Sequence, residues 1–330
     1  MTIEESKTGG GPRLTTQLKR RIVFSVCVFA AIALVITWLR GGVVVGSMDI
    51  RMDPMFRIPQ PPRDIEWWPL GTYISIGVVA VADVVLIGMG IRDYLRTKSW
   101  MPLMVGLSAL AYVIPEVFVD VLGGVYMTAD QHLVIFEILG REMGVFILLS
   151  WLSYGWVPYA FYKLLLSNPK TKALWIGLLG AAIANVVNEE WLLLFRAYHY
   201  YGNQPLVLLN TLPWWWIPCN SVGAILCASI AYRYRHLLRG WRTLAMFVIS
   251  PMCVMGVYGF IAMPSFIAVN GDYPWLPTQL AGLATVGLGI AVFMAILHLV
   301  LQRHPLDLDH IPTSGAHDVV GNPESGVTKK

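Results

Sequence analysis

Charged residues are scarce in this sequence. Asp, Glu, Lys and Arg make up 13% of its 330 residues, whereas 56% are hydrophobic. A water-soluble chain of this size needs a larger polar fraction to cover its surface, so the apolar excess is expected to face lipid. The net charge is only +4 and the basic residues form no long tract, so the sequence does not support nucleic-acid binding.

The sequence also lacks the motifs of several membrane-enzyme chemistries. Its four cysteines form no CxxC pair and its seven histidines form no HxxxH or HxxHH cluster, which argues against a disulfide, zinc or di-iron framework. There is no Walker, GxSxG or HExxH motif. The aspartate-rich DDxxD and NDxxxD patterns that hold magnesium diphosphate are absent too. We therefore expect no metal and no other cofactor.

What the sequence does contain is a series of long apolar segments. A helix that crosses a bilayer needs roughly 20 mostly apolar residues. Eight segments meet this requirement. The third is the shortest and the fifth carries polar residues at its end, so a count of seven transmembrane helices stays open. The segments lie at about 22–39, 70–91, 101–119, 143–162, 173–195, 213–232, 243–264 and 278–301.

The basic residues predict how these segments are oriented, because Arg and Lys accumulate on the cytoplasmic side of membrane proteins. With the N-terminus inside, the cytoplasmic segments hold three quarters of the 24 Lys and Arg residues. The outer segments hold Arg40, Arg51, Arg57, Arg63, Arg141 and Arg196. We predict an all-α, polytopic membrane helix bundle of about eight transmembrane helices in a cell membrane, with both termini in the cytoplasm.

One membrane domain is expected between two polar tails. Residues 1–21 are polar, Gly-rich and basic and are assigned to a cytoplasmic N-terminal tail, and 22–301 form the transmembrane domain. The first apolar run continues too far for a cleaved signal peptide. Residues 302–330 are polar and rich in turn formers, which predicts a disordered cytoplasmic C-terminal tail.

Ionisable residues near the predicted outer ends of the spans are candidates for function, because they are costly to place in a membrane. Glu116 and Asp120 are four residues apart and share a helix face. Pro115 lacks a backbone N–H and is expected to bend the helix beside them. Glu137 and Arg141, at the start of the fourth span, have the spacing of an i,i+4 ion pair.

The fifth span carries the densest group of polar residues, with Asn185, Glu189 and Arg196 at spacings that share one helix face. Aromatic and amide side chains follow it, so these groups are expected to converge near the outer leaflet. The alternative is that they are ordinary charges in water, with Trp at the headgroup level. The candidate catalytic residues are Glu116, Glu189, Asp120, Glu190 and Asn185, and the candidate substrate-binding residues are Trp214, Trp215, Asn220, Tyr198, Arg196 and Arg141.

Carboxyl, amide and aromatic groups in an apolar wall are suited to acid catalysis on an apolar lipid or isoprenoid. A buried carboxylic acid protonates an alkene or epoxide, and Trp and Tyr rings stabilise the resulting cation. Metal-independent, membrane-bound terpene and carotenoid cyclases work in this way and are the leading case. The Pro-Glu of VIPEVFVD and the paired acids of NEEW are two-residue similarities to such cyclases, which identify no family.

Two other classes of function stay open. A proton-coupled transporter of small molecules or lipids would use Asp83, Glu116 and Glu189 as relays, although no inverted repeat is evident. Asp83 lies past the middle of the second span. If it is not a proton relay, we expect it to be a structural hydrogen-bond donor. A non-catalytic assembly subunit would dock a partner through the basic segment RYRHLLRGWR, which a solvated loop explains as well. We expect membrane lipids and an apolar small molecule as partners, and the sequence indicates no protein partner.

Overall fold

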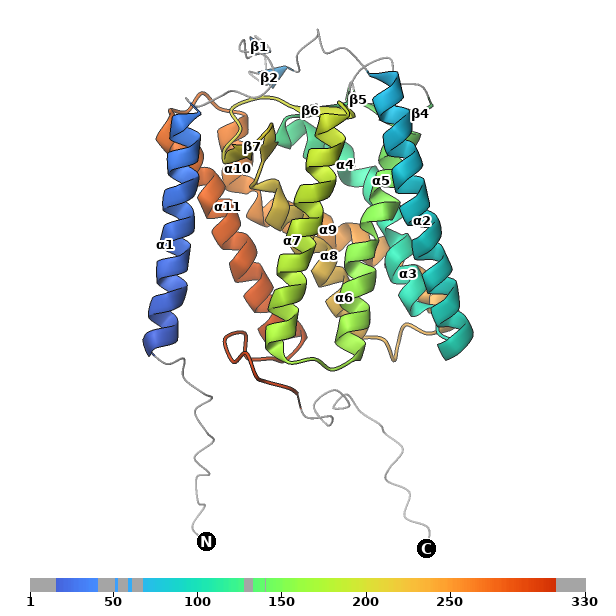
Figure 1. The fold of residues 1–330 in the computed structure, drawn as a ribbon. Coiled ribbons are helices and arrows are strands. Elements are labelled where there is room, and N and C mark those ends of the chain that lie inside the picture. Colours follow the sequence, from blue (N-terminus) through green and yellow to red (C-terminus); the bar gives the residue numbers. More distant parts are fainter. Residues whose placement is uncertain are drawn as a thin grey trace, which may run out of the picture.

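The computed structural model describes residues 16–40, 51–52, 59–60, 68–127, 133–139 and 141–312. Helices make up 73% of the structure and strands contribute little. Figure 1 shows the long helices side by side, with the short strands gathered toward one end. The predicted all-α, polytopic helix bundle is therefore confirmed.

The helices follow the predicted apolar segments, with some of them divided into shorter pieces. The piece between α3 and α4 is a 3-10 helix (Ser108–Tyr112) and another 3-10 helix (Gly240–Ala245) precedes α9. In chain order the α-helices are α1 (Thr16–Leu39), α2 (Pro69–Thr97), α3 (Met101–Leu107), α4 (Val113–Gly123), α5 (Val145–Tyr154), α6 (Trp156–Leu166), α7 (Thr171–Leu194), α8 (Trp216–Arg233), α9 (Met246–Ile261), α10 (Met263–Val269) and α11 (Trp275–Ala295).

The breaks have local causes. Pro115 has no N–H to offer to the carbonyl of Ala111, and the chain forms the 3-10 helix just before it. The bend predicted beside Glu116 stays a prediction. Gly155 separates α5 from α6, and a Cβ there would lie 2.3 Å from the carbonyl oxygen of Gly106. Glycine at this position therefore allows α3 to approach the junction closely.

Seven helical stretches of the described residues are long and apolar enough to cross a membrane. They correspond to all the predicted segments except the sixth, which forms α8, so the count of eight stays a prediction. The start of α1 and the end of α11 lie at the same end of the bundle (Figure 1), as the predicted eight crossings would place them. The side of the membrane that each end faces also stays a prediction.

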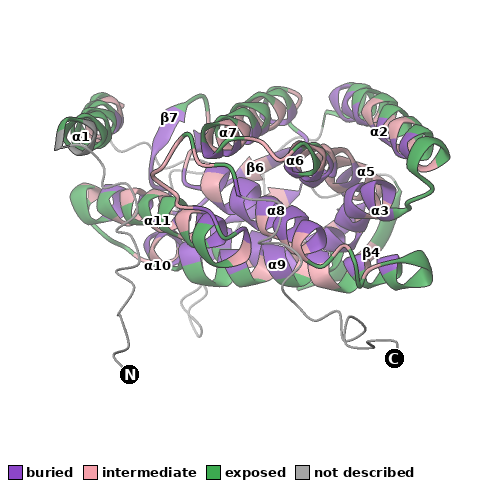
Figure 2. Cartoon of the chain, turned by 90° about the horizontal axis from the view of Figure 1, so that it is seen from below, coloured by how far each residue is buried: buried purple, intermediate pink, exposed green. Residues whose placement is uncertain are grey.

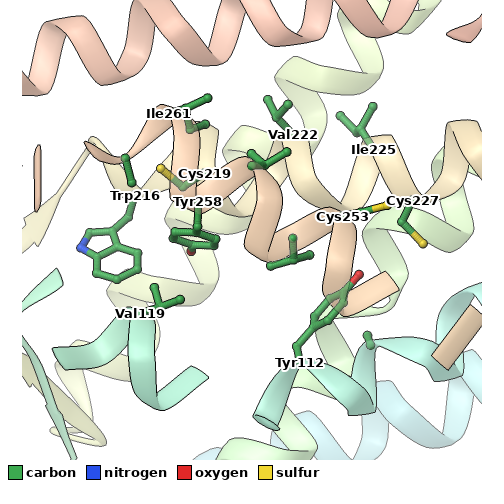
Figure 3. Packing of buried hydrophobic residues seen from close by; sticks show 14 of the residues in the cluster. Tyr112, Val119, Trp216, Cys219, Val222, Ile225, Cys227, Cys253, Tyr258 and Ile261 are labelled. Atoms are coloured by element: carbon green, nitrogen blue, oxygen red, sulfur yellow. The ribbon is translucent and has the colours of Figure 1, made fainter. Parts of the chain in front are cut away.

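Helix α8 lies at the centre of the bundle, between a layer with α7, α6 and α5 and a layer with α11 and α9 (Figure 2). Most of its residues are buried, including Asn220, Ser221 and Ser229. Its small residues allow close packing, since a Cβ on Gly223 would lie 2.9 Å from the Cα of Val254 in α9. Figure 3 shows Cys219 and Cys227 of α8 in the same apolar cluster as Cys253 and Tyr258 of α9.

Among the described residues, four antiparallel pairs of short strands either join segments that are distant in the chain or close a hairpin. The pair β4–β5 overturns one prediction, because Glu137 and Arg141 lie on opposite strands of a hairpin and not one helical turn apart. The pairs are β1 (Arg51–Met52) with β2 (Pro59–Gln60), β3 (Val125–Met127) with β6 (Tyr198–Tyr200), β4 (Val134–Ile138) with β5 (Arg141–Gly144), and β7 (Val207–Leu209) with β8 (Leu212–Pro213).

The first part of the predicted disordered tail is held against the bundle. The guanidinium of Arg303 is buried, donates a hydrogen bond to Asn168 at 3.1 Å and also donates to the carbonyl of Pro169. The indole of Trp175 donates to the carbonyl of Pro305 at 2.8 Å. Residues 303–305 are therefore hydrogen-bonded to the bundle, and the disorder predicted for the tail stays a prediction. Residues 1–15 and 313–330 of the predicted tails lie outside the described residues.

Candidate functional site

A cavity of about 70 Å³ lies between α4, α5, α7, α8 and α9, next to the β3–β6 pair. This volume is about that of two water molecules in the liquid. Aromatic rings form part of its wall, from Phe146, Trp151 and Trp216. Its polar lining consists of Glu116, Asp120, Ser150, Tyr154, Asn188, Glu189, Tyr198, Tyr200, Asn220 and Tyr258.

The β3–β6 pair brings the two acid-bearing helices together. Strand β3 follows α4, and β6 follows α7, so their pairing joins the ends of these helices. Gly124 ends α4 with a left-handed backbone (φ 65°) and returns its N–H to the carbonyl of Asp120. Side chains alternate along a strand, which puts Tyr198 and Tyr200 on one face. That face is turned toward the cavity.

Glu189 is the most extensively hydrogen-bonded acid of the cavity. Its Oε2 accepts a hydrogen bond from the hydroxyl of Tyr200 at 2.9 Å and another from the hydroxyl of Tyr198. Its Oε1 accepts from the amide Nδ2 of Asn185 at 3.5 Å and of Asn220 at 3.3 Å. Both oxygens of this carboxyl are thus held in place by neutral donors from β6, α7 and α8.

The same network continues through the bundle to α9. The amide of Asn220 also donates to Oδ1 of Asn185 at 3.3 Å. The hydroxyl of Tyr258 donates to Oδ1 of Asn220. Helices α7, α8 and α9 are therefore linked behind the cavity by side chains with complementary donors and acceptors, which gives Glu189 a defined orientation.

Glu116 and Asp120 face the cavity from α4, as their spacing predicted. Trp151 is a hydrogen-bonding neighbour of Glu116. Arg141 is near enough to interact electrostatically with Asp120. The guanidinium of Arg141 donates its hydrogen bond to the hydroxyl of Tyr201 at 2.6 Å. Among the described residues, no basic side chain lies within ion-pair distance of the three cavity acids.

Four buried polar atoms of the lining have no hydrogen-bond partner in the described part of the chain. They are Oδ2 of Asp120, Oγ of Ser150, the hydroxyl of Tyr154 and Nε1 of Trp216. Buried polar groups are normally hydrogen-bonded, because leaving them unpaired costs free energy. The cavity is therefore suited to a polar group and not only to a hydrocarbon.

Several predicted residues lie elsewhere. Helix α7 ends at Leu194 and Arg196 follows with a left-handed backbone (φ 53°), so its exposed side chain leaves the face that carries Glu189. Glu190 is turned away from the cavity and interacts with Asn210 and Arg40. A residue next to Glu189 points in another direction because successive helical residues are about 100° apart.

The tryptophans at the start of the sixth segment are also separated. The buried indole of Trp215 donates to the side-chain carbonyl of Gln204 at 3.1 Å. Gln204 in turn donates to the carbonyl of Gly123 at 2.7 Å, so Trp215 holds the end of α4 in place. Trp214 packs with Leu206 and Leu208 beside α1. It is the next residue, Trp216, that reaches the cavity.

The structure thus separates the predicted site residues that lie at the cavity from those that lie elsewhere. Glu116, Asp120, Glu189, Tyr198 and Asn220 line the cavity, with Asn185 and Arg141 hydrogen-bonded around it. Sequence reasoning missed Tyr200, Trp151, Tyr154, Trp216 and Tyr258 as lining residues. The i,i+2 spacing of the tyrosines would have identified Tyr200 once a strand was assigned. Tyr258 lies in a uniformly apolar segment and carries no such signal.

Two further titratable groups, Asp83 and His199, are relevant to the possible chemistry. Asp83 is buried in α2, away from the cavity lining, and neither of its carboxyl oxygens has a hydrogen-bond partner in the described residues. His199 lies between the two tyrosines of β6; burial and the charge of Arg196 lower its pKa to about 4. The described residues contain no group of three or more His, Cys, Asp or Glu arranged to hold a metal ion.

Comparisons of the chain with protein-family models, curated proteins and solved structures give no match. The apolar helices define a multi-pass membrane protein.

Proposed function

We propose that this membrane protein is an intramembrane enzyme that transfers protons between carboxyl groups and an apolar substrate, with no metal taking part. The observation that supports this proposal is that Glu116, Asp120 and Glu189 line one small, aromatic-walled cavity. A pair of carboxyl groups in different surroundings can serve as general acid and general base.

The surroundings of the acids suggest a division of roles. Glu189 accepts hydrogen bonds at both oxygens, which suits a carboxylate that receives a proton. Glu116 has the indole of Trp151 as its hydrogen-bonding neighbour, whereas Glu189 has four donors, so the carboxylate of Glu116 is stabilised less and Glu116 suits the acid that donates a proton. Donation to an alkene or epoxide forms a carbocation, and loss of a neighbouring proton to Glu189 restores a neutral product. The net reaction is an isomerisation or cyclisation without oxidation.

Such a reaction also requires that the carbocation be stabilised, and aromatic faces of the cavity wall can do this. The rings of Tyr200, Trp216 and Tyr258 form a series, with centroids 5.7 Å apart for the first two and 5.6 Å apart for the last two. All three line the cavity. The negative faces of such rings stabilise cations by about 0.5 to 2 kcal/mol each.

The volume of the cavity limits how a substrate binds. About 70 Å³ accommodates only the reacting end of an isoprenoid or similar lipid. The remainder would lie along the lipid-facing surfaces of α4 and α7, where Ile114, Phe118 and Val187 are exposed. Cyclisation at the end of a long isoprenoid is the leading case, since only that end has to enter.

A transporter has less support. A continuous polar route from the cavity to Asp83 would favour it, but the described residues show no hydrogen bond to that carboxyl. An assembly role would fit a flat surface better than an acid-lined cavity between helices.

The test is expression in a host that makes farnesyl- and geranylgeranyl-derived lipids, with the extracted lipids compared by mass spectrometry. We expect a new product with the wild-type chain, and its loss in Glu116→Gln and in Glu189→Gln at unchanged membrane abundance. The matched control is Glu190→Gln, which removes the neighbouring carboxyl that does not line the cavity. Full product formation in both cavity variants, or equal loss in all three, would contradict the proposal.

A further inference from the structure

We propose that the other end of the bundle carries a binding site for the phosphate group of an anionic membrane lipid. A second cavity, of about 520 Å³, lies among the end of α2, the start of α3, the end of α6 and the segment between α8 and α9. These elements meet at the end of the bundle that also holds the start of α1 (Figure 1). The site is separate from the acid-lined cavity and does not depend on the function proposed for it.

The lining of this cavity carries one sign of charge. Lys98, Lys163, Arg235 and Arg239 contribute to it from three separate segments, and no Asp or Glu does. Gly240, with a left-handed backbone (φ 57°), turns the chain directly after Arg239. The hydroxyl of Thr243 donates to the carbonyl of Gly240 at 2.8 Å and holds this turn.

Most of this charge is not neutralised within the bundle. Asp93 pairs with Lys163 at 2.7 Å and also accepts a hydrogen bond from Tyr159 at 2.8 Å. Lys98 and Arg235 instead lie over tyrosine rings, at 5.8 Å and 4.5 Å from the centroids. No carboxylate of the described residues lies within ion-pair distance of Lys98, Arg235 or Arg239. These three cations are therefore available to an external anion.

The rim of the cavity indicates that the anion belongs to a lipid. Trp100 lines the cavity, is partly exposed and stacks on Tyr94 with centroids 3.8 Å apart. Trp241, which is 79% exposed, and the exposed Leu244 follow the turn at Gly240. Exposed Trp beside basic residues is typical of the headgroup level of a membrane. Basic pockets between transmembrane helices bind anionic headgroups, and this volume suits a glycerophosphate group.

The test is lipid binding to the purified full chain, measured by native mass spectrometry with phosphatidylglycerol and phosphatidylcholine. Each cavity cation that contacts the phosphate should contribute roughly a fivefold change in affinity for anionic lipid, so Lys98→Gln with Arg239→Gln should weaken phosphatidylglycerol binding roughly thirtyfold. Neither side chain makes a hydrogen bond within the described structure, so the fold should be retained. The conservative Arg235→Lys should keep the preference for phosphatidylglycerol.

The matched control is Arg20→Gln with Arg21→Gln, which removes two exposed cations from α1 at the same end of the bundle. Because neither arginine lines the cavity, the affinity should stay within about a factor of two of the wild type. Equal binding of both lipids by the wild type, or equal weakening by the control pair, would overturn the proposal. Displacement of phosphatidylglycerol by inorganic phosphate would overturn the lipid assignment in favour of a soluble anion, and resistance to it supports the lipid.

Discussion

Tyr198 donates a hydrogen bond to the carboxyl of Glu189, although the two residues belong to different elements, β6 and α7. The contact forms because α7 ends at Leu194 and the chain turns back to pair with β3. The carboxyl that we propose as a proton acceptor is therefore held by the strand pair and not by its own helix alone.

This contact predicts energetic coupling between the two residues. A hydrogen bond to a charged group contributes roughly 1.5 to 3 kcal/mol, so Tyr198→Phe and Glu189→Gln should each lower the stability of the protein. The double variant should lose less than the sum, by at least about 0.5 kcal/mol. Thermal unfolding in detergent would measure this, with the exposed Tyr234 replaced by Phe as a control. Strict additivity would mean that the contact contributes nothing.

A second prediction concerns the end of α4. A Cβ on Gly124 would lie 2.3 Å from the carbonyl oxygen of Tyr201, and its backbone is left-handed (φ 65°). Gly124→Ala should therefore destabilise the protein by more than about 1 kcal/mol and displace β3. The matched control is Gly180→Ala within α7, where nothing lies within 4 Å of the added carbon. It should leave the melting temperature unchanged or raise it. Equal effects of the two substitutions would contradict this packing.

The depressed pKa of His199 predicts a pH dependence of stability. Burial and Arg196 lower this pKa from its usual 6.5 to about 4 in the folded state. Between these values the unfolded state binds more protons, so stability should fall as the pH decreases from 6.5 toward 4. His199→Gln should flatten this decline in melting temperature. A decline that is unchanged in His199→Gln would exclude this source of pH dependence.

The predicted orientation has a direct test by cysteine labelling. Cys219, Cys227 and Cys253 are buried, so Cys27→Ser yields a background of low reactivity. In that background, Asp272→Cys should react with an impermeant maleimide on intact cells, whereas Ser99→Cys should react only after lysis. The reverse pattern would show that the bundle has the opposite orientation in the membrane. Labelling of both sites from outside would place the two loops on one side and overturn the predicted topology.

The sequence by itself determined the fold class and the helix positions. A bilayer-spanning helix satisfies its backbone hydrogen bonds internally and needs a long apolar run, so both properties are encoded locally. The same local logic placed Glu116 with Asp120, and Asn185 with Glu189, on shared helix faces. It failed for Glu137 and Arg141, because the hairpin that contains them depends on pairing between strands.

Only the tertiary structure decided which acids meet. Helical spacing relates residues within one helix and stops at its end, which is why Arg196 leaves the face of Glu189. Whether Glu189 or Glu190 faces the cavity depends on how α7 packs against α8, where the amide of Asn220 reaches Glu189. Trp216, and not Trp214 or Trp215, lines the cavity for the same reason. Packing between helices joins side chains far apart in the chain, and no local pattern specifies that choice.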